Sequence, residues 1–548
     1  MIRSDLAIRV NAIIDGLKQS GELPDTVPFA EISEPRDPDH GDFATNFALE
    51  AAKVAGMPPR AVAEKVAGKL IEKGDFQNVE IAGPGFINLT LSNDYLAEWA
   101  KIAATETQIS AERNGPMLKV LIEFVSVNPN GPIHLGHGRG AAYGDTLARC
   151  FAAAGHEVWR EFYVNDGVNS LQMQLFGESV KALYRQSLGL DFDFPEEGYK
   201  GESVEEVAAT IRAEHGDGHA DDGLEFWQPV AQQLMIERQR ADLERFGVVF
   251  DQWFSEQSLH ENGKVDEAIA YLRKEGAIYE NDGALFLKST TFGDDRDRCV
   301  VRSNGNPTYI ASDIAYHKDK FDRGHDFLID VFGPDHHGYV ERTYAAVQSL
   351  GYGRDRLRIV ITQMVRFIKD GNPAPMRKRN GEYYRLSDLM DELGSDVVRF
   401  FYLMRSHDTH MDFDLDLALE HSDKNPVYYA QYAHARINSL LKKGTAEGFT
   451  ADASQLGLLS QRAERDLVKK IWDLPYTVDK IVSDFGVHRL ATYVTELARE
   501  YHNFYDKCPV LKAETRDLAN ARMALCEAAS LALRQTLGLL GVSAPEEM

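Results

Sequence analysis

The stretch of residues 120–155, VLIEFVSVNPNGPIHLGHGRGAAYGDTLARCFAAAG, decides the expected fold of this chain. It opens with an almost unbroken apolar run, which favours a strand buried on both faces of a parallel sheet. Residues 128–132 have turn chemistry, because Pro fixes φ and Gly allows it to be positive. From about His134 the pattern becomes helical, and Gly155 ends it. A strand, a glycine-bearing turn and a helix N-terminus present backbone N–H groups and the positive end of the helix dipole to a phosphate.

Two histidines lie in the first turn of the expected helix. His134 and His137 are three residues apart, so both side chains can reach the same phosphate chain. Gly136 between them leaves room for a purine to lie against the backbone. A lone His-x-x-His pair is more often structural, and a metal pair is disfavoured because no third ligand cluster is nearby. The combination with a buried strand, a Pro/Gly turn and a small-residue helix favours a nucleotide site.

With Glu123, Ser126 and Asn128 ahead of it, the motif at 134–137 resembles the HIGH signature of class I aminoacyl-tRNA synthetases, specifically of the arginyl-tRNA synthetase family. The resemblance covers the whole chain. It implies an arginine–tRNA ligase that activates L-arginine with ATP to arginyl-adenylate and transfers the arginyl group to the 3′-terminal adenosine of tRNA(Arg). It also implies ATP with Mg²⁺ as a substrate complex, no tightly bound metal or organic cofactor, and a need for tRNA in arginine activation. The implied catalytic residues are His134, His137 and Lys378; the implied ATP-binding residues are His134, Gly136, His137, Gly333, His337, Met376 and Lys378; the implied arginine-binding residues are Glu123, Ser126, Asn128, Tyr309 and Asp313.

Length and pattern predict a multidomain α/β protein. At 548 residues the chain is too long for one domain. We expect a Rossmann-type parallel-sheet catalytic domain over 115–424 with a helical insertion at about 170–295. An N-terminal α+β domain over 1–105 and a C-terminal all-α helical bundle over 425–548 flank it.

Composition limits the choice of partners and compartment. The net charge of −25 argues against bulk attraction to nucleic acid, so tRNA binding requires local basic surfaces. The four cysteines are scattered and form neither a zinc pattern nor a disulfide framework. No apolar signal core and no membrane-spanning run is present in the sequence. We therefore expect a cytoplasmic protein without a membrane partner, and a monomer.

The N-terminal segment carries two further signatures. His-Gly-Asp-Phe-Ala-Thr-Asn at 40–46 and Gly-Pro-Gly-Phe-Ile-Asn at 83–88 resemble the extra N-terminal domain of arginyl-tRNA synthetases. In that family the domain touches the tRNA D-loop, which implies RNA contacts for Phe43 and Asn46. A turn followed by a helix cap explains the same residues without RNA.

Tyr309 and Asp313 are four residues apart and therefore share one helical face. A phenol beside a carboxylate can clamp a guanidinium, because Asp offers two acceptors that match its fork. The alternative is a helix N-terminal carboxylate beside a packed tyrosine. In the arginyl family the matching Tyr and Asp bind the substrate guanidinium, which favours the binding role. Downstream, a strand at about 326–332 ends in a loop with Gly333 and His337, similar to the adenosine-side loop of class I synthetases.

A strand predicted over 357–367 leads into a basic loop at 369–381. Such a loop can grip pyrophosphate as charge develops in the transition state. It falls where the family has its KMSKS-type loop, with a departure: Pro375 stands for the first lysine and Arg377 for the serine, while Met376 and Lys378 remain. Whether Arg377 or Arg379 compensates is open.

The chain is predicted to be helical from residue 425 to the end, similar to the anticodon-binding domain of the family. Aromatic and polar side chains on its first helix suit unpaired bases. These candidate tRNA-binding residues are Tyr428, Gln431, His434 and Arg436.

Three other interpretations compete. A synthetase for another amino acid is disfavoured by the acidic residues Glu123, Asp313 and Asp335, which suit a cationic substrate. A synthetase-like RNA-binding protein without catalysis is supported only by the altered 375–378 loop. A small nucleotidyltransferase would leave both flanking domains without a purpose.

Overall fold

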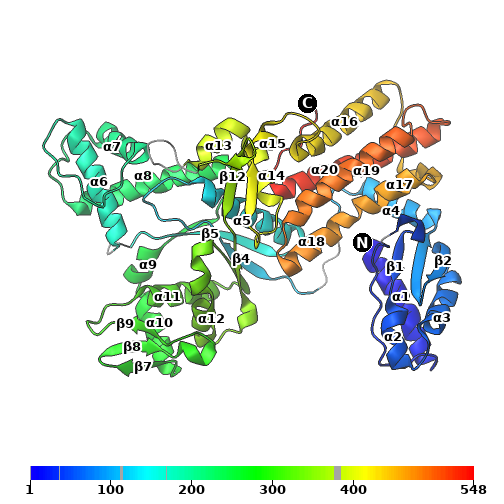
Figure 1. The fold of residues 1–548 in the computed structure, drawn as a ribbon, viewed down its shortest axis with the longest axis horizontal. Coiled ribbons are helices and arrows are strands. Elements are labelled where there is room, and N and C mark those ends of the chain that lie inside the picture. Colours follow the sequence, from blue (N-terminus) through cyan, green and yellow to red (C-terminus); the bar gives the residue numbers. More distant parts are fainter. Residues whose placement is uncertain (1, 36, 111–114, 168–169, 376–383) are drawn as a thin grey trace.

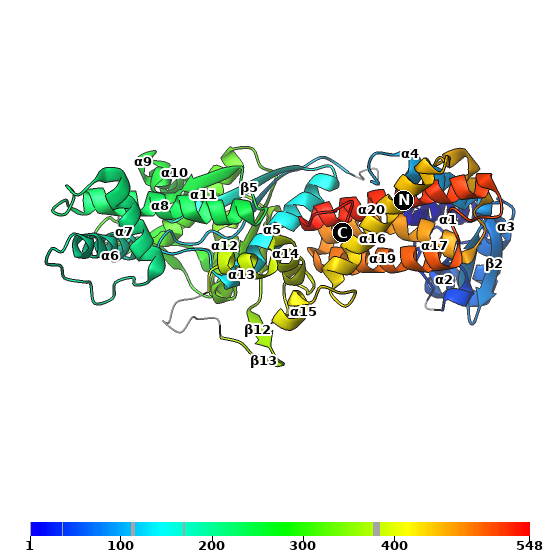
Figure 2. The same cartoon turned by 90° about the horizontal axis from the view of Figure 1, so that it is seen from above.

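The computed structural model describes residues 2–35, 37–110, 115–167, 170–375 and 384–548. The molecule is elongated, with an N-terminal unit at one end, a parallel sheet in the middle and a helical lobe at the other end (Figures 1 and 2).

The N-terminal unit is an α+β sandwich of helices on a small sheet. Its three strands are antiparallel in the order β1-β3-β2. The apolar stripe of the first helix is buried as its helical spacing predicts. The elements are α1 (Ile2–Gln19), η1 (Pro38–His40), β1 (Phe43–Thr45), α2 (Phe47–Ala55), α3 (Pro59–Ile71), β2 (Phe76–Ala82), β3 (Phe86–Leu91) and α4 (Asn93–Thr105).

The central sheet has five parallel strands in the order β11-β10-β4-β5-β6. The chain builds outward from β4 to β5 and β6, then returns to the other side of β4 for β10 and β11. The strand order therefore reverses between β4 and β10, and the crevice beyond their carboxyl ends is where such sheets bind ligands. The strands and their connecting helices are β4 (Lys119–Glu123), α5 (Leu135–Ala153), β5 (Glu157–Val164), β6 (Gln252–Ser255), α11 (Tyr309–Asp322), β10 (Phe327–Phe332), η3 (Pro334–Tyr339), α12 (Val340–Ser349), η4 (Arg354–Arg356) and β11 (Leu357–Ile361).

The predicted strand over 357–367 is divided in the structure. Its first half is β11 of the central sheet, and its second half opens β12 (Val365–Lys369), which pairs with β13 (Asn372–Pro373) and β14 (Met411–Asp414). Thr362 N still donates to Phe332 O of β10, and the break occurs at Gln363, whose N–H donates to His407 O. The ladder of β11 cannot continue through a residue whose amide is bonded elsewhere.

Residues 170–301 contain a helical lobe and a second small sheet. The helices α6 to α8 pack around the fully buried Trp227 and form the end of the molecule opposite the N-terminal unit (Figure 1). The chain then returns to the central sheet through β6 before it forms an antiparallel sheet of β7, β8 and β9. The elements are α6 (Leu171–Ser187), α7 (Glu202–His215), α8 (Leu224–Arg245), α9 (Glu256–Glu261), α10 (Lys264–Lys274), β7 (Ile278–Asn281), β8 (Ala284–Leu287), η2 (Ser289–Phe292) and β9 (Arg298–Val301).

The rest of the chain is helical, apart from β14, and packs between the central sheet and the N-terminal unit (Figure 1). The predicted α/β fold with an α+β N-terminal part and an all-α C-terminal part is therefore confirmed. Among the described residues, no helix is both long enough and apolar enough to cross a membrane. The elements are α13 (Leu386–Leu393), α14 (Ser395–Leu403), α15 (Leu415–Leu419), α16 (Pro426–Ala446), η5 (Ala453–Leu458), α17 (Arg462–Ile471), α18 (Asp473–Asp484), α19 (His488–Lys507) and α20 (Arg516–Leu540).

Polar contacts join the N-terminal unit to α17. Asp42 accepts hydrogen bonds from Arg465 and Lys469 at 2.8 Å each, and the indole N–H of Trp472 donates to Trp99 O. Burial opposes ionisation of Asp42, but the two cations hold its pKa below its usual range.

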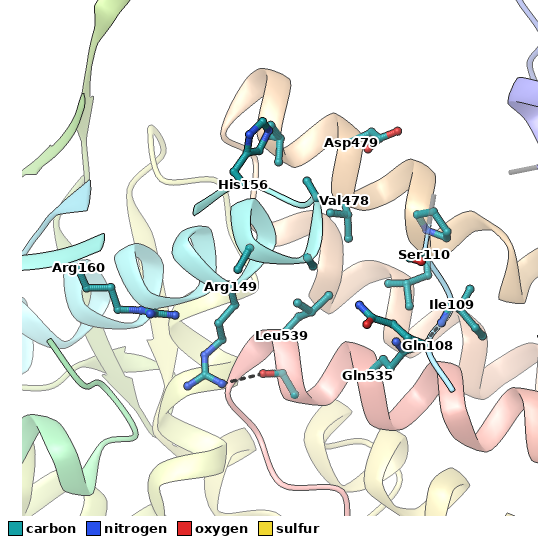
Figure 3. Close-up of a pocket in the computed structure, with 17 residues that line it drawn as sticks. Gln108, Ile109, Ser110, Arg149, His156, Arg160, Val478, Asp479, Gln535 and Leu539 are labelled. Atoms are coloured by element: carbon teal, nitrogen blue, oxygen red, sulfur yellow. Dashed lines mark hydrogen bonds between the residues drawn. The ribbon is translucent and has the colours of Figure 1, made fainter. Parts of the chain in front are cut away.

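A cavity of about 510 Å³ lies where α5, α18 and α20 meet (Figure 3). On its floor Arg149 donates to Gly538 O, and Ile109 N donates to the side chain of Gln535. Its walls come from four segments that are distant in the sequence, at 108–110, 149–160, 474–482 and 535–539. It lies at the far end of α5 from the two histidines, so it is separate from the predicted site.

Candidate active site

The predicted phosphate-binding loop and the predicted adenosine-side loop lie beyond the carboxyl ends of β4 and β10, which pair with each other in parallel. The loop after β4 runs from Phe124 to His134, and the loop after β10 begins at Gly333. Both therefore border the crevice at which the strand order reverses. The sheet brings together two sequence motifs about 200 residues apart.

His134 and His137 are positioned by the first turn of α5. His134 is the N-cap, and its Nδ1 accepts a hydrogen bond from Gly136 N at 3.0 Å. Nδ1 of His137 accepts from His134 N at 3.4 Å, and the two rings are stacked with centroids 3.4 Å apart. The predicted pair of histidines on one face of the first turn is present.

Burial sets the protonation state of both rings. It lowers the pKa of His134 to about 4, and burial together with His134 lowers the pKa of His137 well below its usual value. Both imidazoles are therefore neutral at pH 7. Because Nδ1 of each ring accepts from a backbone N–H, the proton is on Nε2, which makes Nε2 a donor suited to a phosphate oxygen.

Gly136 is required by the histidine beside it. A Cβ at this position would lie 2.9 Å from Cε1 of His134, closer than side chains tolerate. A larger residue would displace the ring or the cap. The glycine therefore allows the imidazole to lie against the helix N-terminus.

The end of the basic loop is attached to this helix N-terminus. Leu135 N donates to Tyr384 O, and Leu386 N donates to Ile133 O, so the segment that follows the loop pairs with the backbone on both sides of His134. On the other side of the loop, Ala374 N donates to Phe367 O of β12. Met376 and Lys378 lie outside the described residues.

Gly333 and His337 belong to the loop beyond β10. Gly333 is the N-cap of η3, and His337 Nε2 lies 3.4 Å from Nε2 of Gln363. A Cβ atom added at Gly333 would make only an ordinary van der Waals contact with His336. These two residues line the β10 side of the crevice, as predicted for an adenosine-side loop, but no contact singles out a role for either.

The residues after β4 have a strained backbone. Val125 and Ser126 have φ of 70° and 42°, a conformation that is a genuine outlier for a β-branched residue. The Ser126 hydroxyl donates to Glu123 and accepts from Tyr163 N, which fixes the turn. Such strain is typical of sites that must hold a particular geometry. Asn128 is also predicted to bind arginine. Its side-chain amide donates to Gln172 and accepts from Asn165.

Glu123 is tied to a buried ionic cluster beneath the crevice. Its Oε2 accepts from Nζ of Lys320 at 2.6 Å, and the same Nζ donates to Asp330 at 2.9 Å. His317 reaches the second oxygen of Asp330 at 2.9 Å. Burial would raise the pKa of Asp330, but Lys320 and His317 hold it below its usual range. Lys320 thus pairs with both carboxylates, while burial raises the pKa of Glu123.

Tyr309 and Asp313 lie in the first two turns of α11, as predicted. Tyr309 is 64% exposed, and the side chain of Asp313 is 38% exposed, so both can be reached by a ligand. The carboxylate of Asp313 has one partner among the described residues, Arg342, whose Nη2 lies 3.7 Å from Oδ2. Desolvation raises the pKa of Asp313, and Arg342 opposes that effect.

Glu256 is a candidate that the sequence did not single out. It begins α9, directly after β6, and is only 6% exposed. Burial, Asp313 and Asp166 raise its pKa to about 7, and none of the described residues pairs with its carboxylate. Helix α9 packs on α11 through a 3.2 Å contact between His260 and Ser312.

The pKa of Tyr163 indicates that several acidic side chains lie close together near this site. Burial and four carboxylates raise the pKa of Tyr163 well above its usual value. The four carboxylates belong to Glu256, Asp313, Glu123 and Asp166. An acidic site without its own full complement of cations suits a cationic ligand. Within the described parts of the chain, no cluster of three or more His, Cys, Asp or Glu side chains has metal-binding geometry.

The predicted tRNA-binding residues differ in accessibility. Phe43 is 2% exposed and belongs to the N-terminal core, while Asn46 donates to Glu50 at the surface. Gln431 and His434 are buried and bond to Asp396, Ser543 and Pro545 of neighbouring segments.

Tyr428 and Arg436 are partly exposed. Tyr428 packs beside His421, and Arg436 stacks on Tyr505 at 4.1 Å. Tyr432, on the same helix, is 49% exposed. Helix α16 thus presents an aromatic and cationic surface.

Comparison with known proteins identifies the class of protein. Residues 6–91 match the arginyl tRNA synthetase N terminal domain, residues 100–439 match the tRNA synthetases class I (R) catalytic domain, and residues 430–548 match the DALR anticodon binding domain. The fold and the crevice are thus those of a class I aminoacyl-tRNA synthetase.

Full-length relatives name the family. The chain is 43% identical to Arginine--tRNA ligase 1 of Halalkalibacterium halodurans over 98% of both chains. It is 42% identical to the arginine--tRNA ligase of Bacillus subtilis over 99% of this chain and 98% of that one. Its fold superimposes on Thermus thermophilus arginyl-tRNA synthetase over the whole of both chains with a TM-score of 0.78 at 21% identity. This chain belongs to the arginyl-tRNA synthetase family, which confirms the family and the class of enzyme expected from the sequence.

Proposed function

We propose that this chain is an arginine–tRNA ligase whose crevice holds ATP on the histidine side and arginine on the acidic side. The observation that carries the proposal is the gathering of Glu256 and Asp313 at one edge of the same sheet whose β4–α5 junction presents His134 and His137. An anionic nucleotide and a cationic amino acid then meet at the end of β4.

In the first step, a carboxylate oxygen of arginine attacks the α-phosphorus of ATP, and the bond to the β,γ-pyrophosphate breaks. Arginyl-adenylate and pyrophosphate are the products, and no proton is consumed. The Nε2–H groups of His134 and His137 donate to phosphate oxygens as negative charge moves onto the leaving group. Mg²⁺ enters with ATP as part of the substrate. Lys378 is proposed to place a further positive charge on the pyrophosphate, beside Mg²⁺.

In the second step, the 2′- or 3′-hydroxyl of the terminal tRNA adenosine attacks the arginyl carbonyl and AMP leaves with the bonding electrons. The proton of the hydroxyl passes to the AMP phosphate or to solvent. Little covalent chemistry falls to side chains, so positioning and charge stabilisation account for the rate.

Arginine is proposed to bind with its guanidinium between Asp313 and Glu256, beside the exposed ring of Tyr309. Two carboxylates offer acceptors for several of the five guanidinium N–H donors. Because the pKa of Glu256 is about 7 in the free enzyme, it must lose its proton to pair with the substrate. Arginine binding should therefore weaken as the pH falls below 7.

On the tRNA side, we propose that the surface of α16 around Tyr428 and Arg436 contacts unpaired bases of tRNA(Arg), and that the N-terminal unit contacts the tRNA around Asn46, since Phe43 is buried in the core. Aromatic rings stack on bases, and an arginine can pair with phosphate. We also propose that the enzyme works as a monomer in the cytoplasm, where its three substrates occur together.

The test is charging of total tRNA with labelled arginine, with the other amino acids as competitors. Only unlabelled arginine should suppress the signal. Asp313→Asn should raise the KM for arginine by about tenfold or more and leave the KM for ATP near the wild-type value, because one charged hydrogen-bond acceptor becomes neutral. Charging with another amino acid would establish a different synthetase, and no charging at all would favour an RNA-binding protein without catalysis.

A further inference from the structure

The carboxylate that is proposed to bind the substrate already has a guanidinium beside it. Arg342, in the first turn of α12, places Nη2 3.7 Å from Oδ2 of Asp313. This separation is longer than a hydrogen bond. The contact is therefore an ion pair without the directional bonds that would hold Asp313 in one orientation.

Arg342 is also incompletely satisfied. Its Nε is buried and has no hydrogen-bond partner. The guanidinium is held by stacking, with its carbon 3.3 Å from the centroid of the Tyr339 ring. Its side chain is 19% exposed. A buried N–H without a partner is unfavourable, so Asp313 and Arg342 form a weak pair rather than a structural one.

A second arginine beside α12, Arg354 in η4, makes the hydrogen bonds that Arg342 lacks. Arg354 stacks on Tyr344 at 3.8 Å, and two of its nitrogens donate to both oxygens of Glu341 at 2.8 Å. Residues 339–354 thus contain two arginines stacked on tyrosines, one with a carboxylate at hydrogen-bond distance and one without. Only the one at Asp313 leaves the carboxylate without a hydrogen bond from the arginine.

We propose that Arg342 is a resident guanidinium that occupies the arginine subsite weakly and sets its selectivity, because a substrate must replace it on Asp313. This rests on the proposed binding of arginine by Asp313. A guanidinium can replace another guanidinium with two parallel hydrogen bonds, whereas the ammonium of lysine is a point charge without that fork. Arg342 thereby lowers the affinity of the subsite for every cationic ligand. Only arginine offsets this lower affinity, because its guanidinium can form two parallel hydrogen bonds with Asp313.

The experiment compares Arg342→Met with Arg354→Met. Methionine keeps an unbranched side chain that can still contact the tyrosine ring, and thermal melting verifies that both variants fold. Arginine binding is measured by calorimetry and by the KM for charging, and lysine is tested as an inhibitor of charging. Arg342→Met should bind arginine about two- to fivefold more tightly, the range for a partly exposed ion pair. Lysine should become a better inhibitor by a larger factor. Arg354→Met should match the wild type in both.

The coupling to Asp313 gives a second readout. In the Asp313→Asn background, the Arg342→Met change should produce no further gain in arginine affinity, because the competition is for the lost charge. Unchanged or weaker arginine binding by Arg342→Met would overturn the proposal and make Arg342 a residue that supports Asp313. A gain that persists without the Asp313 charge would also overturn it. If the wild type fails to bind arginine at all, the proposed function fails instead.

Discussion

Replacement of Arg399 should uncouple three parts of the molecule that meet at α5. The guanidinium of Arg399 is 1% exposed. It donates from Nε to Leu540 O at the end of α20, from Nη1 to Phe246 O just after α8, and from Nη2 to Asp145 on α5. One side chain on α14 thus holds the carboxyl ends of two helices to the helix that carries the candidate histidines. Carbonyl groups at helix C-termini carry partial negative charge, which favours a cation there.

The magnitude follows from what Arg399→Met leaves behind. Two buried carbonyl groups lose their donor, and Asp145, whose side chain is 2% exposed, loses one of its cations. Breaking a buried pair by removing one partner costs about 3–5 kcal/mol. Asp145 keeps Arg149 at 2.8 Å and Arg160 at 3.5 Å, so we expect the lower end, about 3 kcal/mol.

The assay is urea unfolding followed by far-ultraviolet circular dichroism, together with hydrogen exchange at the ends of α8 and α20. A matched control is Arg366→Met, which removes a bidentate pair with Asp412 on the surface, with both bonds at 2.8 Å. That pair is solvated on all sides and should contribute nothing measurable. Arg399→Met should unfold at clearly lower urea and exchange faster at both helix ends. Equal midpoints for the two variants would refute the view that Arg399 ties these helices together.

Three further outcomes are expected. His134→Ala and His137→Ala should each slow arginyl-adenylate formation about a hundred- to a thousandfold, the effect of losing a transition-state donor; single-turnover rates near wild type would remove both from the mechanism. Lys378→Ala should nearly abolish pyrophosphate release, and Arg377→Ala should be almost as damaging if it replaces the missing lysine; wild-type release in both would exclude the loop from catalysis. Asp42→Asn should lower stability by about 2 kcal/mol at pH 7 in thermal or urea unfolding. Because the folded pKa of Asp42 lies below its usual value, its contribution is present above the usual pKa and lost as the pH falls through the folded pKa, so the variant and wild type should converge in acid; a difference that persists there would contradict this account.

The sequence predicts correctly those elements whose local residue pattern matches their burial and spacing in the structure. The almost unbroken apolar run that begins at Val120 forms β4, which is paired on both sides and ends at Glu123, and the helix that begins after His134 is capped by the His134 side chain. Tyr309 and Asp313 were placed correctly on one helix because a four-residue spacing is a local property.

Long-range contacts account for what the sequence did not predict. The run at 357–367 is predominantly apolar, and it is divided into strands of two sheets by the bond of Gln363 N to His407 O and by the pairing of β12 with β14. Glu256 reaches the crevice because β6 pairs with β5, a contact that spans about 90 residues. The burial of Gln431 and His434 depends on the segment at 543–545. No local pattern contains this information.

Carboxylates on and around helix α11 have two different functions. On its inner side, Lys320 donates to both Glu123 and Asp330 at hydrogen-bond distance, so both buried carboxylates have a cation partner within the protein. Two turns earlier, Asp313 has only the distant Arg342, and Glu256 has no cation among the described residues. Uncompensated carboxylates at the edge of a sheet are unfavourable for folding, and the protein tolerates them where a cationic substrate can complete the balance. Whether the chain supplies its own cation therefore distinguishes the carboxylates that stabilise the fold from those that are available to bind arginine.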